Sequence, residues 1–240
     1  MLEKTRGILI KTTKYSESSL VVKIYTELLG MRTYLVRGVR KKKSKTPLSL
    51  FQMLSVLDLV VYEKQGRDIQ NIKEIKPHFL YATIPYEIQK TSIAIFINEL
   101  IYKSIQEEEP NTELFRFIIQ SLLYLDESKQ DYQNFHLLFM MGLSRYLGFE
   151  PSLNYQAQQE IFDLQEGRYT SLKIIETASI HPPLSKIFFE MSQASSFSQK
   201  LTIHRKQRQL LLEKMIQYYQ FHLQGFGELK SLDILKEIMR

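Results

Sequence analysis

The sequence predicts an α+β protein in which a small five-stranded β-barrel precedes an α-helical domain with a small β insertion. Three observations predict this fold class. Short runs rich in β-branched residues fill the first eighty residues, apolar residues at helical spacing follow from Tyr81, and a hairpin pattern turns at Glu166 and Gly167. We therefore expect a β-barrel domain over 1–80 and a helical domain over 81–240, with an insertion at about 150–183.

The barrel is expected because five apolar, β-branched runs alternate with turn-forming residues. Period-two alternation is clearest at Leu57, Leu59 and Val61, which share one face, whereas Asp58 lies on the other and is expected at a sheet surface. A closed barrel has no free edge strands, so five short strands in about eighty residues favour closure. The expected strands are 5–13, 19–26, 31–36, 54–62 and 68–75.

The helical domain is expected from apolar residues at i, i+3 and i+4 spacing. Asn111 or Thr112 can cap one of these helices, and Gly225 and Gly227 separate a long helix from a final short one. The expected helices are 92–105, 112–125, 131–149, 205–226 and 229–239, and the expected hairpin is 160–171.

The composition excludes several classes of protein. There is no cysteine, which excludes disulfides, thiolate catalysis and cysteine zinc sites. The first apolar run, GILI, is too short for a signal-peptide core, and no run approaches the roughly 18 apolar residues of a membrane span. We expect a soluble, cytoplasmic protein.

Motifs for catalysis are missing from the sequence. No phosphate-binding GxxxxGK[ST] loop and no GxGxxG turn occurs, and the five histidines are far apart without metal-ligand spacing. The acidic run at 107–109 is expected to be a solvated helix end. We therefore expect neither an enzyme nor a cofactor, although a catalytic site assembled from distant residues stays open.

The strongest chemical signal is the segment RGVRKKKSK at residues 37–45. Residues 1–80 carry 16 Lys or Arg and 7 Asp or Glu, whereas the rest of the chain carries 16 and 19, so positive charge is concentrated in the barrel domain. Such a patch points to a polyanion partner. A solvated loop and a nuclear-import signal are the alternatives. The principal candidates for phosphate contact are Arg37, Arg40, Lys41, Lys42, Lys43 and Lys45.

Further cations and aromatic residues of the barrel domain accompany this segment. Tyr15, Tyr25 and Tyr34 lie among the charges, and some of them can offer ring faces for base stacking, the alternative being a place at the rim of the core. Tyr34 is included among the candidate nucleic-acid-binding residues. Weaker candidates for phosphate contact, which depend on the register of the barrel, are Lys11, Lys14, Lys23 and Arg32.

Five segments spread along nearly the whole chain carry a family resemblance. They read TRGILIKTTKYSESSLVVKIYTELLG, YLVRGVRKKKSK, LFQMLSVLDLVVY, LSRYLGFEPSL and FHLQGFGELKSLDIL. In these segments the chain resembles the RecO family of bacterial DNA-repair and recombination mediators.

The resemblance implies an OB-fold for the barrel and a role without catalysis. It implies binding of single- and double-stranded DNA, annealing of complementary strands, action on DNA coated by single-strand-binding protein (SSB), and cooperation with RecR to load RecA. It also implies association with the nucleoid, and binding of the acidic, apolar SSB tail by the helical domain. Cations that open the long helix are candidates for that contact, the alternative being a solvated helix end: Arg205, Lys206 and Arg208.

One departure from the family concerns zinc. Many family members carry two CxxC pairs in the insertion, whereas this chain has no cysteine and, between Asn154 and His181, no histidine. Four-coordinate zinc cannot be built from those side chains. We expect a metal-free protein whose insertion is held by packing of Ile161, Phe162, Leu164 and Tyr169 against the helices. The alternative function is that of an RNA-binding or translation-associated OB-fold protein.

Overall fold

The computed structural model describes residues 1–39, 47–105, 109–130, 132–172 and 175–238. The chain divides into two compact units, one of Met1–Glu87 with Asn98–Leu123 and the other of Ile88–Ile97 with Tyr124–Arg240. Helices α1 (Ile88–Ser104) and α2 (Thr112–Glu127) contribute residues to both units. The domain boundary near residue 80 stays a prediction.

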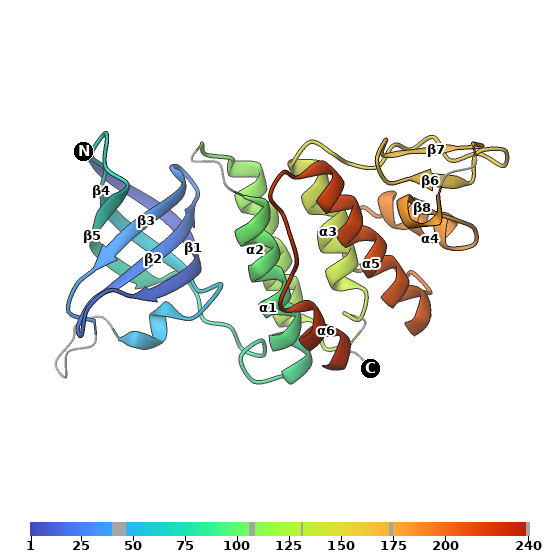
Figure 1. Ribbon diagram of the computed structural model, residues 1–240. Coiled ribbons are helices and arrows are strands. Elements are labelled where there is room, and N and C mark those ends of the chain that lie inside the picture. The colour runs from blue at the N-terminus through green and yellow to red at the C-terminus, as the bar shows by residue number, and fades with distance from the viewer. Residues whose placement is uncertain (40–46, 106–108, 131, 173–174, 239–240) are drawn as a thin grey trace. The chain divides into compact units, whose positions relative to one another are not determined.

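The first unit contains the predicted five-stranded barrel, which is confirmed. Its strands close in the order β1-β2-β3-β5-β4, coloured blue to teal in Figure 1. The pairs are antiparallel except β3 with β5, which is parallel and closes the barrel. The strands are β1 (Leu2–Lys14), β2 (Leu20–Thr26), β3 (Gly30–Val36), β4 (Val56–Tyr62) and β5 (Ile69–Pro77).

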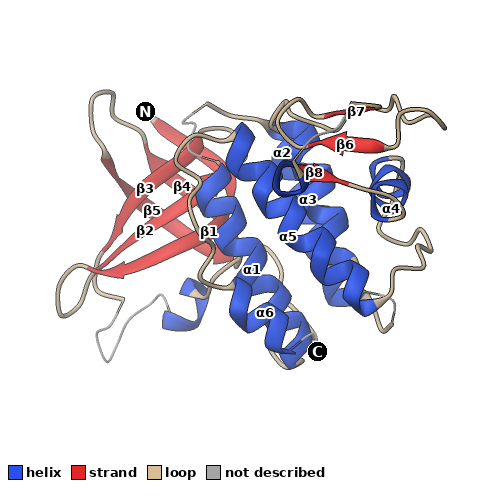
Figure 2. Cartoon of the chain, turned by 45° about the vertical axis from the view of Figure 1, so that its right-hand side comes forward, coloured by secondary structure: helices blue, strands red, loops and turns tan. Residues whose placement is uncertain are grey.

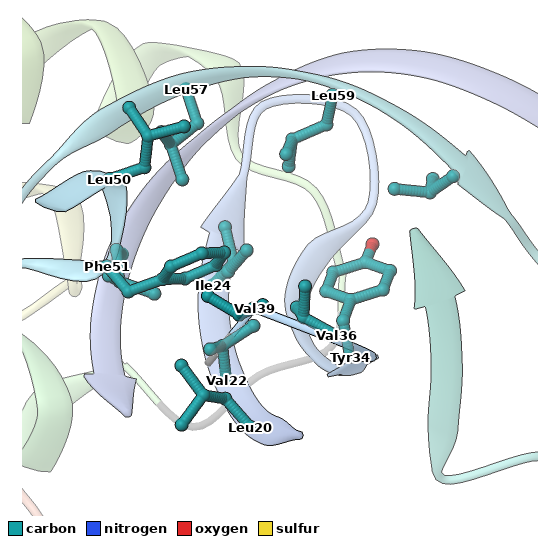
Figure 3. Packing of buried hydrophobic residues seen from close by; sticks show 12 residues of the cluster. Leu20, Val22, Ile24, Tyr34, Val36, Val39, Leu50, Phe51, Leu57 and Leu59 are labelled. Atoms are coloured by element: carbon teal, nitrogen blue, oxygen red, sulfur yellow. The ribbon is translucent and has the colours of Figure 1, made fainter. Parts of the chain in front are cut away.

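The barrel interior is filled by side chains from alternate positions of the strands. Leu57, Leu59 and Val61 are buried as predicted, and Asp58 between them is exposed. Figure 3 shows Tyr34 in this core with Val36 and Leu59. Burying these apolar side chains supplies the main driving force for folding of the barrel.

Gly7 lies where β1 passes close to two neighbouring strands. A Cβ atom at this position would overlap Cγ2 of Ile24 and would lie 2.8 Å from Cδ1 of Leu59. Both approaches are closer than van der Waals contact, so the site has no room for a side chain. Glycine is therefore required here for close packing of strands rather than for a turn.

A β-bulge changes the register of β1 beyond Leu9. Pairing with β2 shifts between Leu9 and Lys11, and Ile10 between them is buried as well. Its carbonyl oxygen accepts a hydrogen bond of 3.1 Å from Nδ2 of Asn98 on α1. As a result Lys11 pairs directly with Lys23 of β2.

The predicted helices are present in the structure, with shifted ends. α1 begins one turn earlier than predicted, and α3 begins at Phe135 instead of residue 131. Asn111 caps α2, since its Oδ1 accepts a hydrogen bond of 2.9 Å from the amide of Leu114. Helix α4 was not predicted, because it is short and follows two prolines. The remaining helices are α3 (Phe135–Tyr146), α4 (Leu184–Ser192), α5 (Arg205–His222) and α6 (Leu232–Ile238).

The insertion in the second unit is a three-stranded sheet, drawn in red beside α4 in Figure 2. The predicted hairpin is confirmed as β6 (Ile161–Asp163) and β7 (Arg168–Thr170), and β8 (Ser179–Ile180) was too short to be predicted.

Aromatic side chains hold this sheet against the helices. The ring centroid of Phe162 lies 4.7 Å from that of Phe188 on α4 and 5.7 Å from that of Tyr218 on α5. The Tyr169 hydroxyl donates a hydrogen bond of 3.2 Å to the carbonyl of Ser185. The predicted packing of Phe162, Leu164 and Tyr169 is confirmed, whereas Ile161 is half-buried.

Replacing Gly7 with alanine is expected to destabilise the barrel. The added methyl group forces Ile24 and Leu59 to move within a packed core, which costs about 1 to 3 kcal/mol. Urea unfolding measures the change, and Glu17→Ala in the exposed β1–β2 turn is the control, expected within about 0.5 kcal/mol of the parent. An equal stability of Gly7→Ala and the parent would contradict the close packing.

Packing rather than metal is expected to hold the insertion. We expect excess EDTA to leave the melting temperature of the untagged protein unchanged, whereas Phe162→Ala, which leaves a cavity, should cost about 3 to 5 kcal/mol. Thermal unfolding followed by circular dichroism tests both. Stoichiometric zinc in the purified protein, or a melting temperature lowered by EDTA, would overturn the expectation.

Candidate nucleic-acid interface

Two lysines lie opposite each other on the outer face of the barrel. Lys11 pairs with Lys23, which pairs in turn with Thr33 of β3. The side chain of Lys23 points outward because Val22 and Ile24 on either side of it are buried inside the barrel, and Lys11, directly opposite, lies on the same face. The register therefore brings together two of the four weaker candidates for phosphate contact.

A groove of about 630 Å³ adjoins these strands and the loop of residues 63–68 between β4 and β5. OB-folds bind oligonucleotides on the face of strands 2 and 3 and the loops beside it, so this groove has the position of an oligonucleotide site. Its charged residues comprise four cations and two carboxylates, which leaves it positive. They are Lys23, Arg32, Lys64, Arg67, Glu63 and Asp68.

The side chain of Gln70 holds the backbone of this loop. Its Oε1 accepts a hydrogen bond of 3.1 Å from the amide of Lys64, and its Nε2 donates to the carbonyls of Lys64 at 2.7 Å and Arg67 at 3.1 Å. Gln70 is buried, whereas the side chains of Lys64 and Arg67 are exposed. Sequence reasoning missed both cations because it assigned the residues between the expected strands 54–62 and 68–75 only to a turn, although two cations at this turn were visible.

The carboxylate of Glu63 contacts two of the predicted site residues, Arg32 and Tyr34. Nε of Arg32 is 3.7 Å from Oε2 of Glu63, and the hydroxyl of Tyr34 donates a hydrogen bond of 3.2 Å to Oε1. Burial, with the neighbouring Glu63 carboxylate, raises the pKa of Tyr34 well above its ordinary value. Arg32 thus has a carboxylate partner inside the groove and is less available to a phosphate than Lys23.

The prediction for Tyr34 needs correction, because its ring is fully buried and has no open face for a base. Strand alternation places it on the inner side with Val36. Tyr25 is buried too, and its hydroxyl donates a hydrogen bond of 3.3 Å to the carbonyl of Asn111. Tyr15 is 65% exposed, so it is the one of the three tyrosines whose ring is open to a base.

The basic segment, which is residues 37–45, follows β3 in the chain. Arg37 is exposed, and Lys14 is exposed at the same end of the barrel, because Lys14 pairs with Leu20 and Leu20 pairs with Val36. The other principal candidates lie outside the described residues: Arg40, Lys41, Lys42, Lys43 and Lys45.

The three tentative partner-binding cations open α5 in the second unit. Arg205 and Lys206 are exposed, and Arg208 lines a groove of about 340 Å³ that also contains Leu138 and Phe197. Nη1 of Arg208 donates a hydrogen bond of 2.9 Å to Oδ1 of Asn134. Burial and the neighbouring charge of Arg205 lower the pKa of Arg208. A half-buried guanidinium beside apolar side chains is suited to an acidic, apolar ligand.

Within the described residues, no group of three or more His, Cys, Asp or Glu side chains is placed to hold a metal ion. The described helices include none that is both long enough and apolar enough to cross a bilayer.

Matches to known protein families extend over almost the whole chain. Residues 1–81 match the family model for the N-terminal part of recombination protein O, and residues 85–233 match that for its C-terminal part. Proteins named DNA repair protein RecO are among the similar sequences. The one from Bacteroides fragilis is 35% identical over 248 residues and the one from Phocaeicola vulgatus 35% over 239 residues, each covering 99% of both chains.

A third such relative, from Flavobacterium psychrophilum, is 35% identical over 237 residues, which is 98% of each chain. The predicted family resemblance is therefore confirmed over the full length of the sequence. Together with the closed five-stranded barrel and the helices that follow it, these matches show that the chain belongs to the recombination protein O (RecO) family.

Proposed function

We propose that the protein is a non-catalytic DNA-binding mediator of recombination in DNA repair. It binds single- and double-stranded DNA, anneals complementary strands, and with RecR assists the loading of RecA on DNA coated by SSB. The observation that carries this proposal is the positive outer face of an OB-like barrel in a RecO-family chain, where Lys23, Lys64 and Arg67 line one groove. Relatives bearing the name DNA repair protein RecO support the same role.

The electrostatics of this face account for annealing. Two DNA strands repel each other through their phosphates, and a cationic surface that neutralises part of this charge lowers the barrier to their approach. Base pairing then supplies the driving force, so nucleotide hydrolysis is not needed. In this proposal, binding to DNA also brings the protein to the nucleoid.

The principal phosphate contacts in this proposal are the cations of the basic segment. Each single-strand phosphate that is neutralised contributes about −0.7 to the slope of log affinity against log salt. Six such contacts reduce affinity roughly 300-fold between 50 and 200 mM salt. The cations are Arg37, Arg40, Lys41, Lys42, Lys43 and Lys45, supported by Lys11, Lys14, Lys23 and Arg32.

The start of α5 is proposed as the contact for the SSB tail. Arg208 lines the groove that contains Leu138 and Phe197, so a carboxylate and an apolar side chain of one peptide can both be accommodated. Arg205 and Lys206 add exposed positive charge next to it. This combination matches an acidic, apolar peptide better than it matches a nucleic-acid backbone.

Replacing Arg40, Lys41, Lys42 and Lys43 together with alanine is expected to weaken binding to single-stranded DNA at 150 mM salt by at least about 10-fold. The slope of log affinity against log salt should become shallower by up to about 3, because four phosphate contacts are lost. Fluorescence anisotropy with a labelled oligonucleotide measures both quantities. Annealing of SSB-coated complementary strands should slow in parallel.

The matched control removes four exposed cations of the helical part, at Lys129, Arg168, Lys186 and Lys230, and should leave both quantities near those of the parent. Unchanged affinity in the quadruple variant of the basic segment would show that this segment does not bind DNA. Preference for a matched RNA oligonucleotide, without annealing of SSB-coated strands, would favour an RNA-binding protein instead.

Arg208→Ala is expected to weaken binding of a peptide that carries the C-terminal residues of SSB by about 10-fold or more, because a carboxylate loses its half-buried partner. Arg208→Lys keeps the charge and should retain part of the affinity. Arg168→Ala is the control, since Arg168 is an exposed cation of the insertion. Equal affinity of the parent and Arg208→Ala for this peptide would show that the groove does not bind the SSB tail.

A further inference from the structure

Tyr102, on the last turn of α1, contacts both lysines of the outer barrel face. Nζ of Lys11 donates a hydrogen bond of 3.2 Å to the Tyr102 hydroxyl, and this nitrogen lies 4.8 Å from the centroid of the ring. Nζ of Lys23 lies 5.3 Å from the same centroid. One aromatic ring thus gathers two ammonium groups that come from neighbouring strands.

The backbone places these three side chains together. The bulge at Ile10 sets Lys11 opposite Lys23, and Asn98 bonds the carbonyl of Ile10. Asn98 and Tyr102 are four residues apart on α1 and so lie on the same face of the helix. The hydrogen bond that fixes the bulge therefore also brings the tyrosine over the lysine pair.

This lysine pair is unfavourable without a negative partner. Like charges at directly opposite positions of two strands repel each other. Within the described part of the chain, neither Lys11 nor Lys23 forms an ion pair with a carboxylate. The electron-rich face of the ring offsets part of the repulsion, but it leaves a net charge of two on one small area.

The hydroxyl of Tyr102 can donate a hydrogen bond to an anion that is bound by the lysine pair. Its oxygen accepts the hydrogen bond from Lys11, so its proton is free to be donated. The hydrogen bond from Lys11 and the charges of Lys11 and Lys23 lower the pKa of Tyr102, whereas partial burial opposes them. Lys23 also lines the groove beside the β4–β5 loop, which connects this cluster to the candidate interface.

We propose that Lys11, Lys23 and Tyr102 form one binding site for a backbone phosphate of DNA, in which Tyr102 positions the two ammonium groups. The inference rests on the proposed DNA-binding function and deepens it. Helix α1 thereby takes part in DNA binding, although the sequence of its last turn carries no cluster of basic residues. Tyr102 acts mainly through the lysines, and its hydroxyl adds a donor for the same phosphate.

The test is a double-mutant cycle on affinity for a labelled single-stranded oligonucleotide. Tyr102→Leu should weaken binding about 5-fold, since both cation–π contacts and the hydroxyl are lost. Tyr102→Phe keeps the ring and should weaken it about 2-fold. In a Lys11→Ala, Lys23→Ala background, Tyr102→Leu should have no further effect, because the residues act as a unit. Tyr86→Leu, at an exposed tyrosine, is the control and should bind like the parent.

Two results would overturn the inference: no loss of affinity in Tyr102→Leu, or the same loss in the background without the two lysines. Thermal unfolding of each variant shows whether a loss of affinity comes from loss of the site or from loss of the fold. If Tyr102→Leu is unstable, Tyr102→Phe, which retains the packing of the ring, replaces it in the comparison with and without the two lysines. The parent's own affinity and salt dependence report on the proposed function separately. A parent that fails to bind DNA overturns that function, whereas a parent that binds while the cycle is additive overturns the positioning role alone.

Discussion

Closure of the five-stranded barrel is the constraint on which the rest of the account depends. The short parallel pairing of β3 with β5 joins the two ends of the sheet, so each strand has one face in a packed interior and one face outside. Leu57, Leu59 and Val61 fill the interior, and the lysines are left outside. Gly7 allows the strands to approach closely enough for this interior to be filled. The positive outer face is therefore a consequence of the same alternation that builds the core.

Positive charge is concentrated on that face of the barrel. Lys11 opposes Lys23, and Lys64 and Arg67 project from a loop whose backbone Gln70 fixes. By contrast, Arg6 is paired with Glu27, and their side chains form two hydrogen bonds. Among the described residues the four cations of the outer face form no ion pair with a carboxylate, and such a group can bind a polyanion and release its counterions.

Much of this could be predicted from local sequence, and the missing parts are non-local. Alternation at residues 57–61 identified an inward face, and of the two expected cap candidates, Asn111 and Thr112, Asn111 caps α2. The opposition of Lys11 and Lys23 depends on a bulge, and Tyr102 lies about ninety residues further along the chain, so neither contact has a local signal. Tyr34 was misassigned because a tyrosine among cations looks the same in sequence whether its ring faces the core or the solvent. Strand parity with Val36 was the signal that distinguishes the two cases.

The central claim is that the outer barrel face and the adjoining basic segment bind DNA phosphates. Lysine footprinting tests it directly: the protein is acetylated with and without a saturating single-stranded oligonucleotide, and the modification of each lysine is quantified by mass spectrometry. We expect protection of Lys11, Lys23, Lys64 and the lysines at 41–43, with Lys129 and Lys186 reacting equally in both samples. Protection confined to lysines beyond residue 124, with those of the barrel unaffected, would contradict it.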